Sequence, residues 1–402
     1  MKFRVKVLKT SGETYTADLE ADSKTALFEL IKGRGDTLVS YVPVDEHAHR
    51  FTIRLPFFGI KTHDKIIIAR NLGAMIEAGL SVTRALSVME KQMKNKKLKV
   101  ILGKVIESIG TGKTLSDSLA QFPQTFSTLF VAMVRAGEES GSLAQSLKVI
   151  ANQQESSYLL TKKVRGAMMY PSIILLAMCG IAFFMLTYIV PTLASTFREL
   201  NVELPLSTRI VIGLSDFLKD NMLVSLVGII SFAAAVYFSA HTKRGKRLLD
   251  GVRLRIPIIG NLVKQINSAR TARTMSSLLS AGVDMLIATQ ITREVLQNTY
   301  YQDTIAEVER RIQKGEPISV VFSENERLYP AFVSEMVSVG EETGQLSQMF
   351  MSVATYYENE VDQRTKDMST IIEPFLMIVI GAAVGFFALS MIGPIYSLGD
   401  NL

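Results

Sequence analysis

A stretch of 19 residues without a charged side chain, from Ser172 to Val190, has a proline at each of its ends. A helix rises 1.5 Å per residue, so this stretch would be about 28 Å long, close to the ~30 Å hydrocarbon core of a bilayer. A second proline-bracketed apolar stretch lies near the C-terminus, and both of its prolines follow those of the first by 203 residues (171 to 374 and 191 to 394). The pattern therefore predicts a transmembrane helix that is present twice.

The repeat at 203 residues extends beyond the apolar stretches. It pairs residues of the first half with identical residues of the second half: Arg70 with Arg273, Gly79 with Gly282, Gly137 with Gly340, Glu138 with Glu341, and Gly141 with Gly344. Between about residues 120 and 136 the match slips, and Pro123 aligns with Pro330 at an offset of 207. A period this long is not that of a solenoid. We expect a duplicated unit, a helical bundle followed by a membrane helix.

Composition supports a membrane protein with large parts in water. Hydrophobic residues make up 48% of the 402-residue chain and its mean hydropathy is +0.24, yet 20% of the residues are charged. The net charge of +6 could indicate nucleic-acid binding, but the basic residues gather beside the apolar stretches, which favours a membrane surface. The single cysteine, Cys179, excludes a disulfide within the chain and a cysteine-based metal site.

The charged flanks of the apolar stretches predict their orientation. A third stretch without charge runs from Met222 to Ala240 and has no counterpart at an offset of 203. Basic residues precede the first stretch at 162–165 and follow the third at 243–255, and such residues concentrate on the cytoplasmic side. We therefore expect three spans, with the N-terminus and both bundles in the cytoplasm and the C-terminus outside.

The expected fold class is mainly α, a polytopic membrane protein with two homologous cytoplasmic helical bundles, three transmembrane helices and a small N-terminal α/β module. In the module, alternating strands surround a short helix from Lys24 to Ile31. The expected boundaries are 1–55 for this module, 56–61 for a linker, 62–167 for the first bundle, 168–191 for the first span, 192–221 for an external loop, 222–240 for the second span, 241–371 for a basic flank and the second bundle, 372–395 for the third span, and 396–402 for an external tail.

The repeated Gly-Glu-Glu-Ser/Thr-Gly segments, at 137–141 and 340–344, are the strongest local signals. In a structural interpretation the first glycine ends a helix in a left-handed conformation, the second permits another sharp turn, and the acids lie at the N-terminus of the following helix. In a functional interpretation the acids dock a basic partner or hold a divalent cation, with Glu138 and Glu341 as weak candidate ligands.

No pattern in the chain predicts catalysis or a cofactor. The segment Gly110–Thr114 resembles a phosphate-binding loop, but the position of its first glycine is Glu107 and a helix is expected before it. A helix connection is the better interpretation. His47 and His49 could take a metal, but a solvated linker is the better interpretation of them. With four histidines and no Ser/His/Asp arrangement, nucleophilic catalysis has no support.

The apolar stretches carry residues that we expect to act in transmembrane packing: Pro171, Pro191, Glu373, Pro374, Gly381, Gly385 and Pro394. Gly381 and Gly385 form a G-x-x-x-G face, which lets two helices approach closely, within the chain or between copies. Glu373 lies at the expected cytoplasmic edge. The spans themselves contain no charged group, whereas coupled transporters and pumps need such groups within the membrane.

Together these features resemble one family, the inner-membrane platform proteins of type II secretion systems and type IV pilus machines. The resemblance covers almost the whole chain and rests on Ala69-Arg70 followed by Ala78-Gly79, the repeated Gly-Glu-x-Ser/Thr-Gly-x-Leu, and the proline-bracketed span. The opening segment, with Gly12 and residues 20–26, is also similar. Asn71 departs from the glutamine that members often carry after this arginine, and Arg273 is followed by Thr274.

The resemblance implies a non-enzymatic scaffold, a homo-oligomer in the bacterial inner membrane that binds no nucleic acid directly. Its expected partners are a hexameric assembly ATPase at the cytoplasmic bundles, pilin or pseudopilin subunits at the membrane helices, other inner-membrane assembly proteins and the lipid bilayer. The alternative from the residues is a small membrane transporter or channel subunit. Pilus assembly, secretion and DNA uptake remain open as the task of the machine.

Overall fold

The computed structural model describes residues 2–8, 14–21, 26, 30–31, 33, 37–44, 60–199, 204–257 and 259–399. It forms two compact units, Met1–Gly59 and Ile60–Leu402. The described part of the first unit is a three-stranded antiparallel sheet in the order β2-β1-β3, built from β1 (Lys2–Leu8), β2 (Thr14–Glu20) and β3 (Thr37–Val44). Most of the helix expected at Lys24–Ile31, and both His47 and His49, lie outside the described residues.

The second unit contains the same series of six helices twice. The first series is α2 (Thr62–Glu77), α3 (Val82–Gln92), α4 (Lys96–Gly110), α5 (Leu115–Ala120), α6 (Thr128–Glu139) and α7 (Leu143–Phe184). The second is α12 (Ile259–Ser280), α13 (Met285–Val295), α14 (Thr299–Gln313), α15 (Ser319–Glu324), α16 (Ala331–Thr343) and α17 (Leu346–Gly399). The first residues of α3, α4, α6 and α7 precede those of their counterparts by 203 residues, as the sequence predicts.

The expected slip of the repeat between residues 120 and 136 is wrong. Pro330 is the N-cap of α16, and Ser127, 203 residues earlier, is the N-cap of α6. The preceding residues, Phe126 and Tyr329, are both buried, with 1% and 0% of their surface exposed. Core and cap positions therefore keep the same offset, and Pro123 and Pro330 are unrelated prolines that lie near each other in the alignment.

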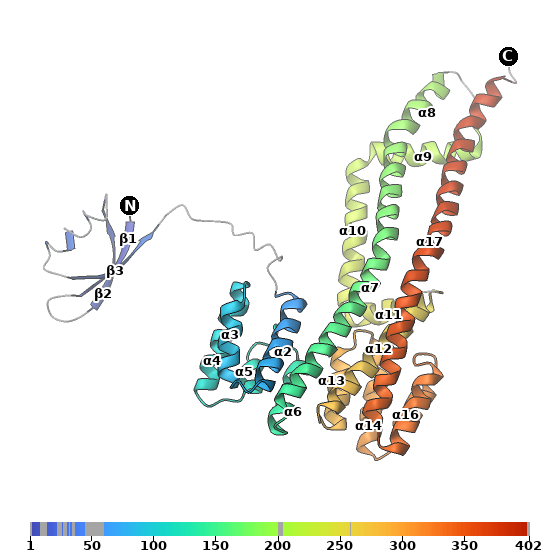
Figure 1. Ribbon diagram of the computed structural model, residues 1–402. Coiled ribbons are helices and arrows are strands. Elements are labelled where there is room, and N and C mark those ends of the chain that lie inside the picture. The colour runs from blue at the N-terminus through green and yellow to red at the C-terminus, as the bar shows by residue number, and fades with distance from the viewer. Residues whose placement is uncertain are drawn as a thin grey trace. The chain divides into compact units, whose positions relative to one another are not determined.

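One helix in each copy is far longer than a bundle needs. Helix α7 has 42 residues and α17 has 54, which correspond to lengths of about 63 and 81 Å. Both start in their bundles and run on through the apolar stretches without a break (Figure 1). Both are long and apolar enough to cross a membrane, within the segments Leu143–Thr196 and Leu346–Ile392.

The bracketing prolines do not end these helices. Pro171 lies inside α7, and Pro374 and Pro394 lie inside α17. At Pro191 the chain instead widens into a π-turn, η2 (Met185–Ile189), and continues as α8 (Val190–Glu199). Proline has no N–H and its ring crowds the carbonyl four residues earlier, and a wider turn relieves that contact while the helix continues.

Three helices connect the copies: α9 (Leu206–Asp220), α10 (Met222–His241) and α11 (Lys243–Arg255). The segment expected as a loop at 192–221 is thus largely helical. Its α9 buries Val211 and Ile212 against Val190 and Met391, and Thr208 donates a hydrogen bond to the carbonyl of Ser390. This amphipathic packing joins the distal ends of α7 and α17, far from the bundles (Figure 1).

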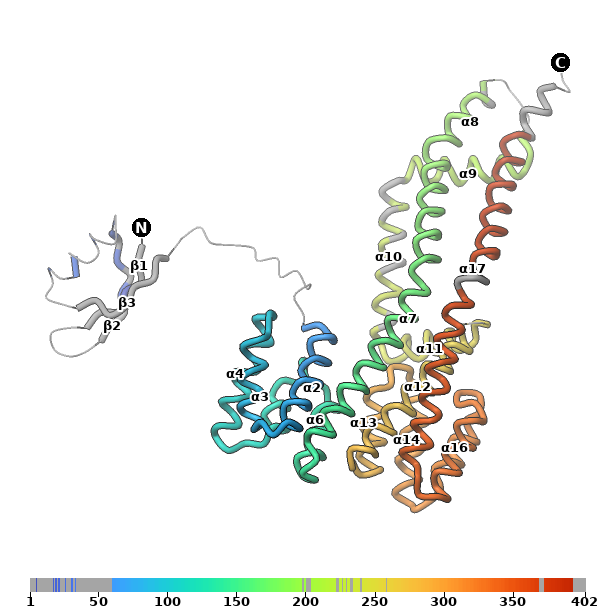
Figure 2. The backbone as a smooth tube through the Cα atoms, viewed as in Figure 1, coloured from blue at the N-terminus to red at the C-terminus, as the bar shows by residue number. Residues whose placement is uncertain are grey.

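The two bundles share one hydrophobic core, because α7 lies against both α12 and α17 (Figure 2). At the contact between the copies, the Gln153 amide donates to Thr274 Oγ1 over 3.4 Å and its oxygen accepts from Ser277 Oγ over 3.2 Å. Lys163 Nζ lies 2.7 Å from Asp362 Oδ1, which joins α7 to α17. The duplicated bundles are therefore one body rather than two independent domains.

Candidate functional site

The repeated Gly-Glu-Glu corners join each bundle to its long helix. Gly137 is buried within α6, and a Cβ built on it would lie 2.5 Å from Ser146 Oγ and 2.6 Å from Ser146 Cβ. At Gly340 in α16 a Cβ would lie 3.0 Å from the Cα of Leu346. The expectation that this first glycine ends a helix in a left-handed conformation is wrong. It stays helical, and its missing side chain lets the next helix approach.

The second glycine of each corner makes the turn. Gly141 has φ of 68° and Gly344 has φ of 71°, the left-handed conformation that glycine adopts without steric cost. Gly79 and Gly282 have φ of 90° and 83° at the ends of α2 and α12. The sharp turn expected at the second glycine is confirmed, and it places the start of each long helix directly against the preceding helix.

The first acid of each corner binds backbone amides. Glu138 accepts hydrogen bonds from Leu115 N (2.6 Å) and Ser116 N (2.9 Å). Glu341 accepts from Ile318 N (2.6 Å) and Ser319 N (3.1 Å). A carboxylate at a helix N-terminus satisfies free N–H groups and interacts favourably with the helix dipole.

These acids cap the short helices α5 and α15, which precede the corner, and not the helix that follows as expected. The reason is that α6 packs against α5 and α16 against α15, so each acid reaches the amides of the short helix beside it. Both oxygens of each carboxylate are already hydrogen-bonded. In the part of the chain that the structure describes, no group of three or more His, Cys, Asp or Glu residues could hold a metal ion. A cation-binding role for Glu138 and Glu341 has no geometric support there.

Each bundle is also attached to its long helix by an arginine. Arg70 on α2 pairs with Glu155 on α7, and Arg273 on α12 pairs with Glu358 on α17. In the second pair, Nε donates to Oε1 over 2.8 Å and Nη2 to Oε2 over 2.5 Å, a bidentate contact. Glu155 and Glu358 were not predicted as partners of these arginines, although they too are separated by 203 residues.

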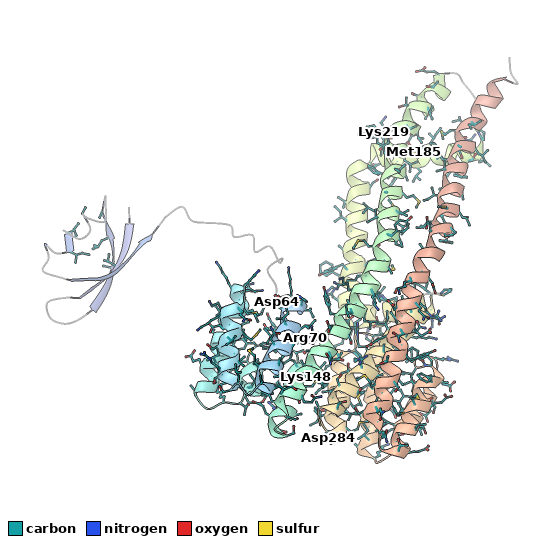
Figure 3. All side chains as sticks on the ribbon, in the orientation of Figure 1. Asp64, Arg70, Lys148, Met185, Lys219 and Asp284 are labelled. Atoms are coloured by element: carbon teal, nitrogen blue, oxygen red, sulfur yellow. The ribbon has the colours of Figure 1, made fainter. Side chains whose placement is uncertain are left out.

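A second contact ties α2 to α7 in the first bundle. Lys148 Nζ lies 2.6 Å from Glu77 Oε1 (Figure 3 labels Lys148 and Arg70 on these two helices). Caps, turns and ion pairs therefore surround about the first four turns of α7 and α17. The arrangement has the chemistry of a rigid joint and not of a reaction site.

The two arginines are expected to differ in their contribution to stability, because their burial differs. The side chains of Arg273 and Glu358 are 15% and 21% exposed, whereas those of Arg70 and Glu155 are 51% and 41% exposed. We expect Arg273→Ala to lower the free energy of unfolding by about 2–3 kcal/mol, since it leaves a half-buried carboxylate unpaired. Arg70→Ala should lower the free energy of unfolding by less than about 1 kcal/mol. Equal losses in thermal unfolding of the full chain would contradict this assignment.

The residues expected to act in transmembrane packing lie on the long helices. A Cβ at Gly381 or Gly385 would meet nothing within 4 Å, so neither glycine packs against another described part of the chain. Glu373 and Pro374 are exposed, and so are Phe375, Met377 and Ile378, whereas Leu376 is buried. Pro171 and Pro191 lie on the first long segment, as described above. Contact between copies of the chain at these glycines remains a prediction.

Comparison with known sequences decides the family. The sequence model of the family described as "Type II secretion system (T2SS), protein F" matches residues 68–191 and again residues 271–394. The two matches are separated by the same 203 residues and together cover more than half of the chain. The chain belongs to the type II secretion system protein F family. Each match runs from the first bundle helix to the proline near the end of the apolar stretch.

Relatives of this family member extend over the full chain. It is 33% identical over 402 residues to the type IV pilus assembly protein PilC of Thermus thermophilus, covering 100% of this chain and 98% of the relative. It is 30% identical to PilC of Myxococcus xanthus over 98% of this chain and 94% of the relative. It is 29% identical to type II secretion system protein F of Pseudomonas aeruginosa, covering 99% and 98%. Family and apolar helices together indicate the inner membrane.

Proposed function

We propose that the chain is the inner-membrane platform of a type IV pilus or type II secretion machine, where it couples a cytoplasmic assembly ATPase to the insertion of pilin subunits into a filament. The family consists of non-enzymatic platform proteins, and the relatives named above carry the assembly and secretion roles in their names. The observation that supports coupling is that each bundle continues as one helix into an apolar stretch.

The proposed topology has three spans. The second of them along the chain is α10, a 20-residue helix whose sequence carries no charge from Met222 to Ala240. Cations precede the apolar part of α7 and follow α10 in α11, so both ends belong in the cytoplasm. Helices α8 and α9 are then external, as is the C-terminus. Both bundles face the compartment that contains ATP.

In this proposal the bundles receive the motion and the long helices deliver it. An ATPase that contacts either bundle displaces a body that capped corners and ion pairs hold to α7 and α17. Because the bundles share one core, a displacement of one bundle moves both helices. The exposed apolar faces of these helices, with Leu176 78% and Leu389 74% exposed, are suited to contact the apolar helix of a pilin subunit.

A labelling experiment tests the compartment of each part. In a Cys179→Ser background, Ser142→Cys and Gln345→Cys place one thiol at each corner, and Lys219→Cys places one at the end of α9. All three positions are exposed. We expect a membrane-impermeant maleimide to label only Lys219→Cys in intact spheroplasts and all three in lysed cells. Labelling of either corner in intact spheroplasts would put a bundle outside and exclude its contact with a cytoplasmic ATPase.

A further inference from the structure

A cavity of about 650 Å³ lies between the two copies, at the level where the bundles meet the apolar helices. Helices α7, α11 and α12 line it. They bring four cations into it, Arg165, Lys246, Arg253 and Arg270, and one carboxylate, Asp250. Its size is that of a site for a small molecule, and its charge favours an anion.

The single carboxylate does not neutralise these cations. Asp250 is 3% exposed, and its Oδ2 accepts from Thr299 N (2.9 Å) and Thr299 Oγ1 (3.2 Å), so it caps α14. Arg253 Nη1 is 3.6 Å from Asp250 Oδ1. No ion pair joins Arg165, Lys246 or Arg270 to any other described residue.

Arg165 and Arg253 are exposed, whereas Arg270 is partly buried. It lies within α12, where burial lowers the pKa of its guanidinium because the charged form loses water. Buried charges in proteins are generally paired or hydrogen-bonded. A cavity that keeps a desolvated guanidinium beside three further cations is therefore incomplete without an anion.

Helix α11 indicates where that anion comes from. Its residues Leu248 and Val252 are four positions apart, which puts them on one face, and are 68% and 46% exposed. Ile256, which follows the last residue of the helix, is 41% exposed. The rest of α11 is rich in lysine and arginine. Figure 1 shows α11 lying across the foot of α10, the apolar helix that precedes it. A short basic helix with an exposed apolar face at this position lies in the plane of a membrane interface.

We propose that the cavity binds the phosphodiester head group of an anionic phospholipid from the cytoplasmic leaflet, with the acyl chains running beside the apolar face of α11. A free phosphate shares the charge but makes no use of that apolar face. Basic pockets on the cytoplasmic side of membrane helices bind such head groups in other proteins. The proposal rests on the topology given above, which puts α11 at the cytoplasmic leaflet.

The test is lipid retention by the full-length chain in a neutral detergent, measured by native mass spectrometry. Phosphatidylglycerol and phosphatidylcholine are added at equal concentration, and inorganic phosphate is the competitor. We expect retention of phosphatidylglycerol over phosphatidylcholine, and little competition by millimolar phosphate. Arg270→Gln and Arg253→Gln should each weaken retention about fivefold, the effect of one cation near a lipid surface. The matched control is Arg84→Gln, at an exposed arginine on α3, and it should change nothing.

Thermal unfolding in the same detergent is the control that shows whether each variant is folded. Arg270→Gln removes an unpaired charge, so without lipid its melting temperature should equal or exceed that of the wild type. Phosphatidylglycerol should raise the melting temperature of the wild type more than that of the variant. The proposal would be overturned if the chain retained the two lipids equally, or if phosphate competed fully. It would also be overturned if both variants retained lipid like the wild type but lost filament or secretion output. The last outcome would assign the cavity to an acidic segment of a partner. Because retention in detergent does not depend on orientation, its failure is distinguishable from failure of the topology.

Discussion

Replacing Gly137 by alanine is expected to lower the free energy of unfolding of the full chain by about 2–3 kcal/mol, the upper range for overpacking a close contact. The added Cβ would lie 2.6 Å from Ser146 Cβ and 3.1 Å from Leu143 Cα. Neither atom is the end of a flexible side chain, so α6 and α7 must move apart. That movement also displaces Glu138 from the N-terminus of α5, since Glu138 is the next residue on α6.

The control for this prediction is Gly103→Ala in the same bundle. Gly103 lies in the middle of α4, and its nearest neighbour, Glu90 Oε1, would be 3.5 Å from the new Cβ, an ordinary contact. Alanine there should stabilise the helix by about 0.5–1 kcal/mol. For Gly340→Ala, whose new Cβ would have its closest contacts at 3.0 Å, the change in the free energy of unfolding should lie between those of the other two variants. A Gly137→Ala chain that unfolds like the wild type in detergent would show that the corner is not closely packed.

Much of this fold follows from the repeat in the sequence. The offset of 203 residues predicts the paired bundles, their equivalent helices and the sharp turns at Gly141 and Gly344, because these depend on local backbone chemistry that both copies retain. The same offset also pairs Glu155 with Glu358, so the repeat alone could have singled them out. These acids were missed because a glutamate on a helix gives no local sign of its partner, and here the partner arginine lies 85 residues away in the chain.

Other features depend on packing that a sequence pattern does not contain. Whether Gly137 makes a turn or a close approach is decided by Ser146 on the next helix. The partners of Glu138 are amides of α5, more than twenty residues earlier. The basic cavity is formed by α7, α11 and α12, whose cations come from both sides of the duplication. The flanking cations were expected to orient the spans, but only the folded chain brings Arg165, Lys246 and Arg253 together with Arg270.

In the proposed function, motion passes from the bundles to the membrane along an unbroken helix. The described residues of α7 give it no break between Leu143 and Phe184, and the bundle ends where the apolar part begins. A flexible segment inserted in α7 at the end of the bundle should therefore separate binding of the ATPase from delivery of subunits to the filament. In the proposed function, binding of the ATPase belongs to the bundles, whereas delivery to the filament needs the continuous helix.

The most direct test inserts four glycines after Gly166, where α7 leaves the bundle, in a deletion strain complemented with the altered chain. The control inserts the same four glycines after Lys94, between α3 and α4. Filaments per cell, or secreted substrate, are measured with co-purification of the assembly ATPase and recovery of the chain in the inner membrane. The account predicts output at the level of the deletion strain for the insertion in α7, with ATPase binding retained, and output near wild type for the control. Wild-type output from the insertion in α7 would contradict it.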